Sequence, residues 1–232
     1  MTLDTTKIKQ VQLKEDQYKK EDCSALKKQI VIHHTAGGAN AENVILGWGM
    51  NSEDVATAFV IAGKPSATST YKDGDVFQAF GSKYWGYHLA FSKSTNKVPV
   101  AYHDFKHETK IAKASIGIEV CNWGGLTKDA NGIYWNYLKK TIPAAEVIEL
   151  STPFRGFTYY HAYTDAQIAA LKDLIIYLCD KFNIPKTYNA DMWDINLRAL
   201  NGDAGIFTHV SYRSDKCDMS PQPKLIEMLK HL

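Results

Sequence analysis

Two adjacent histidines, His33 and His34, end a short apolar run in the sequence QIVIHHTAGG. Neighbouring side chains on a strand point to opposite faces, so at most one of the pair can serve a given site. A third histidine, His209, precedes Cys217 and Asp218 in the sequence GIFTHVSYRSDKCDMSP. Two imidazoles with a carboxylate or thiolate form a ligand set for zinc, and a catalytic zinc keeps its fourth position open.

Each of these residues also has an ordinary structural interpretation. A lone histidine in an apolar strand is more often a hydrogen-bonded core residue than a metal ligand. Cys217 could be a buried thiol, and Asp218 could cap the turn before Pro221. Chemistry alone leaves the third ligand open, because a thiolate and a carboxylate both suit zinc.

A single carboxylate, Glu119, lies inside the apolar run ASIGIEVCN. Burial would raise the pKa of this group, and a nearby metal would lower it. An unpaired buried carboxylate is costly, so Glu119 is either a salt-bridged strand residue or a functional group such as a general base.

The elements that position these residues are predicted from hydrophobic periodicity and turn signals. Strands are expected at residues 28–35, 54–63, 74–81 and 114–122, the last almost continuously apolar and therefore central. A helix is expected over 164–185, with a capping box of Thr164 and Gln167 and with Pro185 at its end, and a second helix over 223–232. This pattern predicts an α/β fold with a central mixed β-sheet flanked by α-helices.

We expect a single domain over residues 1–232, with surface insertions near 127–163 and 186–204. Both segments are rich in aromatic and turn-forming residues and are expected to form loops. Long loops in compact domains are often functional, so these two are candidates for tuning substrate choice.

Composition narrows the possible partners. The 232 residues are 45% hydrophobic and 22% charged, with a formal net charge of +2, which argues against disorder and gives no reason to expect a nucleic-acid partner. No apolar run reaches about 18 residues, so membrane insertion is not expected. The first 23 residues lack the apolar core of a signal peptide, which predicts synthesis in the cytoplasm. Most of the four cysteines are expected to be reduced core thiols.

Four ordered motifs, between Gln29 and Pro221, together resemble one family. The sequences IVIHHTAGG, SIGIEVCNWG, TDAQIAALKDLIIYLCDKFNIP and GIFTHVSYRSDKCDMSP are similar to those of the zinc-dependent N-acetylmuramoyl-L-alanine amidases of the type 2 class. That class shares its fold with the peptidoglycan-recognition proteins. The resemblance therefore implies the peptidoglycan-recognition-protein fold.

The resemblance implies one catalytic Zn²⁺ held by His33, His209 and a third residue two positions after the motif lysine. Lys216 is that lysine, so the register selects Asp218, with Cys217 one residue away as the alternative. The sequence MSP follows where relatives commonly show PG.

The resemblance also implies catalytic roles. Glu119 would be the general base or acid, and Lys216 would stabilise the oxyanion. Another branch of these amidases uses a tyrosine from the second strand, but the corresponding position here is Thr57, which places this chain in the glutamate branch.

Three further residues are candidates for substrate contact. The sequence YWGYHLA resembles a segment that lines the substrate groove in the family, so Trp85 and His88 are expected near the peptide. His34 is a weaker candidate, and all three could equally be packing residues.

These implications predict hydrolysis of the amide between N-acetylmuramic acid and L-alanine in peptidoglycan, in a phage-type endolysin. Such an enzyme would be a monomer, made in the cytoplasm, that acts on the wall after holin-dependent release. A cytoplasmic wall-recycling amidase and a peptidoglycan-binding module without hydrolysis are the alternatives.

Overall fold

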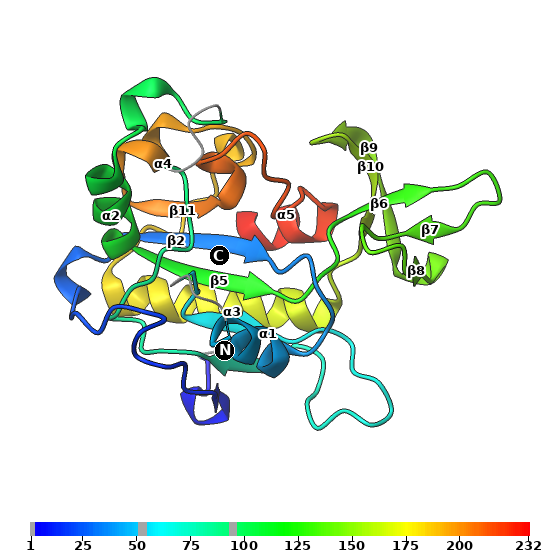
Figure 1. Cartoon of the computed structure of the whole chain (residues 1–232), viewed down its shortest axis with the longest axis horizontal. Coiled ribbons are helices and arrows are strands. Elements are labelled where there is room, and N and C mark those ends of the chain that lie inside the picture. Colours follow the sequence, from blue (N-terminus) through cyan, green and yellow to red (C-terminus); the bar gives the residue numbers. More distant parts are fainter. Residues whose placement is uncertain (1–2, 51–54, 93–96) are drawn as a thin grey trace.

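The computed structural model describes residues 3–50, 55–92 and 97–232, and it is drawn in Figure 1. Within these ranges, a six-stranded sheet has the order β1-β4-β3-β5-β2-β11. Its strands are β1 (Lys9–Gln10), β2 (Gln29–His34), β3 (Phe59–Ile61), β4 (Val76–Gln78), β5 (Ser115–Val120) and β11 (Gly205–Thr208). The predicted mixed sheet is confirmed, because β3, β5, β2 and β11 are parallel while β3 and β4 are antiparallel. Residue 54, where the second predicted strand begins, lies outside the described residues.

The parallel strands end at a common edge of the sheet. β5 pairs with β2 on one side and with β3 on the other, so the predicted central position of the run 114–122 is confirmed. β3 and β4 are joined through a turn in which Gly74 has a φ of +81° that glycine adopts without a Cβ penalty.

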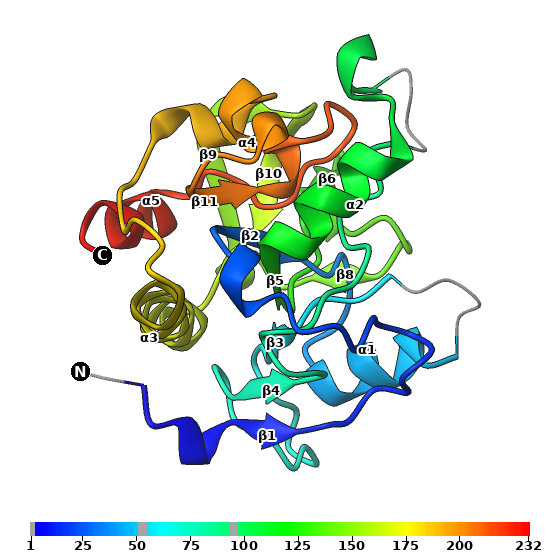
Figure 2. The same cartoon turned by 90° about the vertical axis from the view of Figure 1, so that its left-hand side faces the viewer.

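Helices cover both faces of this sheet. They are α1 (Ala41–Trp48), α2 (Phe105–Ala114), α3 (Asp165–Phe182), α4 (Leu197–Asn201) and α5 (Pro223–Lys230). Figure 2 shows α3 and α5 on one side of the sheet and α2 on the other. Short 3₁₀ helices are η1 (Thr5–Lys7), η2 (Ser24–Leu26), η4 (Val100–Tyr102), η5 (Ala144–Glu146), η6 (Ala190–Trp193) and η7 (His209–Ser211).

The ends of α3 and α5 follow from local sequence. The predicted capping box is present in α3, where the Thr164 side chain accepts from the Gln167 backbone N–H and the Gln167 side chain accepts from the Thr164 backbone N–H. The helix ends at Phe182, and Asn183 follows with a φ of +54°. α5 has a proline, Pro223, in its first turn.

The strand β2 divides its side chains between two hydrophobic clusters. Ile30 and Ile32 belong to the larger cluster, with Leu171 and Leu174 of α3. Val31 belongs to a second cluster, with Ile111 of α2. Successive strand residues face opposite sides of the sheet, so His33 continues the α2 side and His34 the α3 side.

The expectation of surface loops over 127–163 is wrong, because this segment belongs to a second sheet. Within the described residues, that sheet has the strand order β8-β7-β6-β10-β9 and is antiparallel throughout. The strands are β6 (Gly125–Lys128), β7 (Tyr134–Trp135), β8 (Thr141–Ile142), β9 (Val147–Phe154) and β10 (Phe157–His161). Figure 1 shows it beyond the carboxyl ends of β2 and β5.

Gly156, which lies between two strand-like runs, is a turn signal from which the hairpin of β9 and β10 could have been predicted. Arg155 and Gly156 have φ of +48° and +86°, and two consecutive positive φ values are those of a type I′ hairpin turn. Aromatic and β-branched residues flank the turn on both sides.

The segment 186–204 is also more ordered than predicted, since it contains η6 and α4. Met192, Ala199 and Leu200 are buried. The backbone carbonyl of Met192 accepts a hydrogen bond from the Ser211 hydroxyl at 2.8 Å. This hydrogen bond attaches the segment 186–204 to η7, which contains Ser211.

Two sequence expectations concern thiols and membranes. All four cysteines are free, and only Cys217 among them is not fully buried, which confirms the prediction of reduced core thiols. Among the residues described, no helix is both long enough and apolar enough to span a bilayer.

Gly117 in β5 provides a stability prediction. A Cβ at this position would lie 2.6 Å from Thr57 Cγ2 and 3.1 Å from His88 Cγ, so Gly117→Ala should lower the free energy of unfolding by about 1–3 kcal/mol through overpacking. Gly47→Ala is the control, because its Cβ would meet nothing within 4 Å, and alanine should raise helix stability by up to about 1 kcal/mol. Urea unfolding measures both, and equal stability of the two variants would contradict the packing shown.

Candidate metal centre

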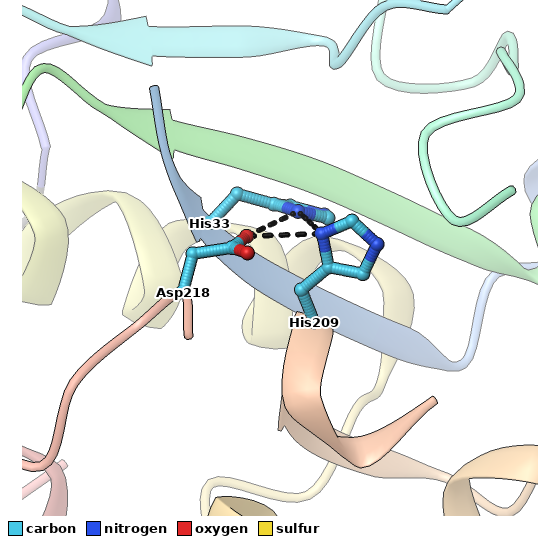
Figure 3. Close-up of side chains that lie close together, drawn as sticks. All are labelled: His33, His209 and Asp218. Carbon is cyan, nitrogen blue, oxygen red and sulfur yellow. Dashed lines mark hydrogen bonds and ion pairs between the residues drawn. The ribbon is translucent and has the colours of Figure 1, made fainter. Parts of the chain in front are cut away.

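Three side chains predicted as metal ligands lie together at the carboxyl edge of the six-stranded sheet. His33 is on β2, His209 begins η7 directly after β11, and Asp218 is in the loop before α5. Parallel strands bring their carboxyl ends to one edge, where ligands commonly bind in α/β sheets. Figure 3 shows the three side chains pointing toward one another.

The distances within this cluster match those of a tetrahedral zinc site. His33 Nδ1 lies 3.1 Å from His209 Nδ1 and 3.2 Å from Asp218 Oδ2. His209 Nδ1 lies 3.0 Å from Asp218 Oδ2. Nitrogen and oxygen donors bound to one tetrahedral zinc lie about 3.3–3.4 Å from each other, so the three donor atoms would need to move apart by only a few tenths of an ångström on binding.

The outer ring nitrogen of His209 shows why a cation suits the cluster. His209 Nε2 lies 3.0 Å from the backbone oxygen of Leu89, which can only accept a hydrogen bond, so Nε2 carries the hydrogen. In the neutral ring Nδ1 is then a bare acceptor, and it faces the carboxylate oxygen of Asp218. Two acceptors at this distance repel each other unless a cation or a proton lies between them.

The ionisation states also fit metal ligands. Burial, together with the nearby His209, lowers the pKa of His33 to about 4, so this imidazole is neutral at neutral pH. Burial by itself would raise the pKa of Asp218, but the interactions with His209 and then with His33 outweigh it and hold that pKa well below its usual range. Neutral imidazole and ionised carboxylate are the forms that bind metal.

The structure distinguishes between the two candidates for the third ligand. Asp218 belongs to the cluster, whereas the Cys217 sulfur is not among the donor atoms gathered there. Burial and the neighbouring Asp218 raise the pKa of the Cys217 thiol, which disfavours the thiolate. The geometry therefore selects Asp218.

His34 lies on the opposite face of the sheet from His33, as strand geometry predicts. Its Nδ1 is 3.0 Å from the hydroxyl of Tyr163, and that oxygen accepts a hydrogen bond from the backbone N–H of Ser220 at 3.4 Å. His34 is 5% exposed. The expectation of substrate contact is therefore corrected: the ring is buried and bonded behind the loop that carries Asp218.

Glu119 is the direct neighbour of His33 across the sheet. The two residues are register partners in the parallel pair of β2 and β5, so their side chains share a face. Glu119 Oε2 is buried and has no hydrogen-bond partner among the described residues. Burial, and then the negative charge of Asp218, raise the pKa of Glu119 well above its ordinary value. Such an orphaned carboxylate beside a donor cluster is typical of a functional group.

Lys216 is half-buried close to the cluster. Its positive charge lowers the pKa of Glu119 and that of His33, although burial dominates both shifts. Its side chain makes no ion pair within the described part of the chain. The ammonium therefore adds positive potential at the site without being neutralised by a fixed partner.

The two predicted groove residues are placed differently from each other. His88 lies against His33, with its Nδ1 2.9 Å from His33 Nε2, and its Nε2 is 2.9 Å from the Ser115 hydroxyl. Both ring nitrogens of His88 thus have hydrogen-bond partners within the protein, and because the residue is half-buried, its contact with substrate stays a prediction. Trp85 is 5% exposed and donates a hydrogen bond to Glu21 at 3.1 Å, so its place in a substrate groove stays a prediction.

Two residues that support the cluster were not identified from the sequence. Ser115 contacts His88 across 27 positions, and Tyr163 contacts His34 across 129 positions. A serine at the start of a strand and a tyrosine before a helix carry no local signal of such a role, because the contacts are made only on folding.

A cavity of about 570 Å³ lies beside the cluster and not at it. Its lining includes Trp123, Glu146, His161 and Tyr163, which places it between the carboxyl edge of the main sheet and the second sheet. None of the three predicted metal ligands lines this cavity. The candidate metal centre is therefore identified by its three clustered donor atoms and does not coincide with this cavity.

The choice of third ligand generates a prediction. Asp218→Asn removes the carboxylate charge and should weaken zinc binding by more than about 100-fold, whereas Cys217→Ser should bind zinc as the unchanged protein does. Chelator competition and elemental analysis of the purified proteins measure both. Loss of zinc in the serine variant and retention in the asparagine variant would show that the thiol is the ligand.

Comparisons with known proteins agree with this fold. The solved structure of PlyL is 14% identical, with 96% of each chain covered and a TM-score of 0.50. The solved structure of a mutant endolysin from Bacillus subtilis is 15% identical, covers 100% of this chain and 98% of that chain, and has a TM-score of 0.51. At these identities the likeness concerns the fold.

No curated protein sequence matches the chain. Residues 25–223 match the family model described as N-acetylmuramoyl-L-alanine amidase. That span contains β2, β5, β11 and all three residues of the metal cluster. The chain therefore belongs to the N-acetylmuramoyl-L-alanine amidase family, and its fold is the one the sequence motifs predicted.

Proposed function

We propose that this protein is a zinc-dependent hydrolase of peptidoglycan that cleaves the amide between the lactyl group of N-acetylmuramic acid and L-alanine. Membership of the amidase family supports the reaction. The observation that carries the metal dependence is the gathering of His33, His209 and Asp218, with their donor atoms 3.0–3.2 Å apart.

The residues present fit a zinc ion, and His33, His209 and Asp218 would hold it. When bound, zinc would polarise the amide carbonyl and make a water molecule at the site more acidic. The neutral state of His33 and the ionised state of Asp218 are the ones required, and the hydrogen bond from His209 to Leu89 fixes the orientation of that ring.

Glu119 moves the proton in this proposal. Its carboxylate accepts a proton from the attacking water, and the protonated group then delivers that proton to the amide nitrogen as the C–N bond breaks. The products are the lactyl carboxylic acid and the free amino group of L-alanine. The raised pKa of Glu119 supports the second half of this cycle, because a readily protonated carboxyl can act as an acid near neutral pH.

Lys216 supplies charge stabilisation. The oxygen of the scissile carbonyl becomes negative as water adds, and a positive charge already in place stabilises it without reorganisation. Lys216 suits this role because its ammonium lies close enough to shift the pKa of Glu119 and is not held in an ion pair within the described residues.

We further propose an endolysin role for this amidase. In that role the enzyme is a monomer made in the cytoplasm, and it reaches the wall after release through a holin-dependent route. A protein named an endolysin shares the fold over 98% of its chain, which supports the choice over a wall-recycling enzyme. Mass spectrometry of sacculi from several bacteria digested with the purified protein tests the bond and the walls accepted.

Glu119→Gln provides the test of the reaction. Loss of the general base should lower the release of new N-terminal alanine from sacculi by about 100- to 10,000-fold, while zinc content stays unchanged. Glu227→Gln alters an exposed carboxyl of α5 and is the matched control. Wall binding without hydrolysis by the unchanged zinc-loaded protein would identify a recognition module instead.

The raised pKa of Glu119 also predicts how stability depends on pH in the zinc-free protein. A carboxyl whose pKa is higher in the folded than in the unfolded state costs stability once it ionises, so the penalty is absent below about pH 4 and grows as pH rises. Glu119→Gln removes the ionisable group and should therefore become more stable than the unchanged protein as pH increases. Urea unfolding from pH 4 to pH 8 measures this difference, and a difference that does not vary with pH would contradict it.

A further inference from the structure

A chain of hydrogen bonds leads away from the metal cluster into the protein. His33 Nε2 lies 2.9 Å from His88 Nδ1, and His88 Nε2 lies 2.9 Å from the hydroxyl oxygen of Ser115. That hydroxyl in turn donates to the backbone oxygen of Ala112 at 3.3 Å. The chain connects a metal ligand on β2 with the last turn of α2.

We propose that His88 and Ser115 are positioning residues that hold His33 in the tautomer whose Nδ1 is free to bind the metal. The inference rests on the proposed function, because it concerns the same zinc site. It assigns to His88 a place directly against the outer nitrogen of the metal ligand His33.

The direction of the hydrogen bonds follows from the last acceptor. The Ala112 carbonyl can only accept, so it takes the hydrogen of the Ser115 hydroxyl. The oxygen of Ser115 is then free to accept from His88 Nε2, which leaves His88 Nδ1 bare. His88 Nδ1 accepts from His33 Nε2, and the Nδ1 of His33 is left bare toward the cluster.

Packing keeps the two rings in this arrangement. The His33 and His88 rings meet edge to face, with centroids 5.1 Å apart and planes at 82°. Gly117 makes room for His88, since a Cβ there would lie 3.1 Å from His88 Cγ. The missing side chain at Gly117 therefore lets His88 lie directly behind His33.

The outer Nε2 atoms of the two ligand histidines are both hydrogen-bonded, but to different kinds of group. His209 Nε2 donates to a backbone carbonyl, that of Leu89, which no substitution can remove. His33 Nε2 depends on the side chains of His88 and Ser115. A neutral metal-bound imidazole becomes a better donor when its outer N–H is hydrogen-bonded, and loss of such a partner typically weakens metal binding 10–100-fold.

Substitution of His88 separates hydrogen bonding from packing. His88→Phe keeps a ring of similar shape but has no acceptor for His33 Nε2, and zinc affinity should fall about 10–100-fold. His88→Asn is smaller but can offer its amide oxygen near the position of Nδ1, so it should recover most of the affinity. Ser115→Ala should show a smaller loss than His88→Phe. His107→Phe is the control, because His107 Nε2 bonds to the Leu200 carbonyl and is not connected to the cluster.

The measurements are chelator competition for zinc and ¹⁵N NMR of the histidine rings in the zinc-loaded protein. The expected spectrum shows a hydrogen on His88 Nε2 and a bare His88 Nδ1. The opposite tautomer of His88 would overturn the proposal, as would zinc affinity in His88→Phe equal to that of the unchanged protein. A merely structural role would make asparagine the weaker binder of the two His88 variants, and that order would also overturn it.

These outcomes are distinct from failure of the proposed function. If the unchanged protein neither binds zinc nor releases alanine from sacculi, the zinc amidase assignment fails and this inference fails with it. If the unchanged protein does both and His88→Phe binds zinc equally well, only the role of His88 and Ser115 is overturned.

Discussion

The parallel pairing of β11, β2 and β5 is the constraint on which the site depends. Its register places Thr208 of β11 opposite Ile32 of β2, so His209 follows next to His33, and it places Glu119 of β5 opposite His33. A shift by one residue in either pair would turn a functional side chain to the other face of the sheet. The hydrophobic burial that fixes this register therefore also fixes the catalytic geometry.

The same alternation gives the two neighbouring histidines separate tasks. His33 faces the α2 side, where it joins the donor cluster. His34 faces the α3 side, where its bond to Tyr163 leads to the backbone of Ser220, two residues beyond Asp218. One strand thus contributes a ligand on one face and, on the other, support for the loop that carries another ligand. Supporting bonds of this kind keep ligands oriented before a metal arrives.

The buried polar groups around the metal cluster include several acceptor atoms that face each other with no donor between them. The outer nitrogens of His33 and His209 are hydrogen-bonded, whereas their inner nitrogens and Asp218 are acceptors that face each other. Glu119 adds a carboxylate oxygen with no hydrogen-bond partner among the described residues. Such an arrangement costs stability in a protein that does not bind a cation there. The unpaired acceptors that cost stability are therefore the same groups that would hold the metal ion and accept the proton in the proposed reaction.

Local sequence determined those features whose physical causes are local. The apolar runs predicted β2, the central β5 and the helix α3 with its capping box, because periodicity and capping depend on residues close in the chain. The separation of His33 from His34 followed from strand geometry alone. Residue type and motif order also identified His33, His209, Glu119 and the pair of Cys217 and Asp218 as the candidates.

Only the tertiary structure decided between Cys217 and Asp218, because the direction of a side chain in an irregular loop is set by the elements that the loop joins. It also placed His88 behind His33 and His34 behind the Asp218 loop, through contacts that span 55 and 129 positions. The second sheet was missed since its strands are short and each depends on its partner for hydrogen bonds. Long-range pairing is not encoded in any single segment, so the sequence determined which residues could react and the fold determined which of them meet.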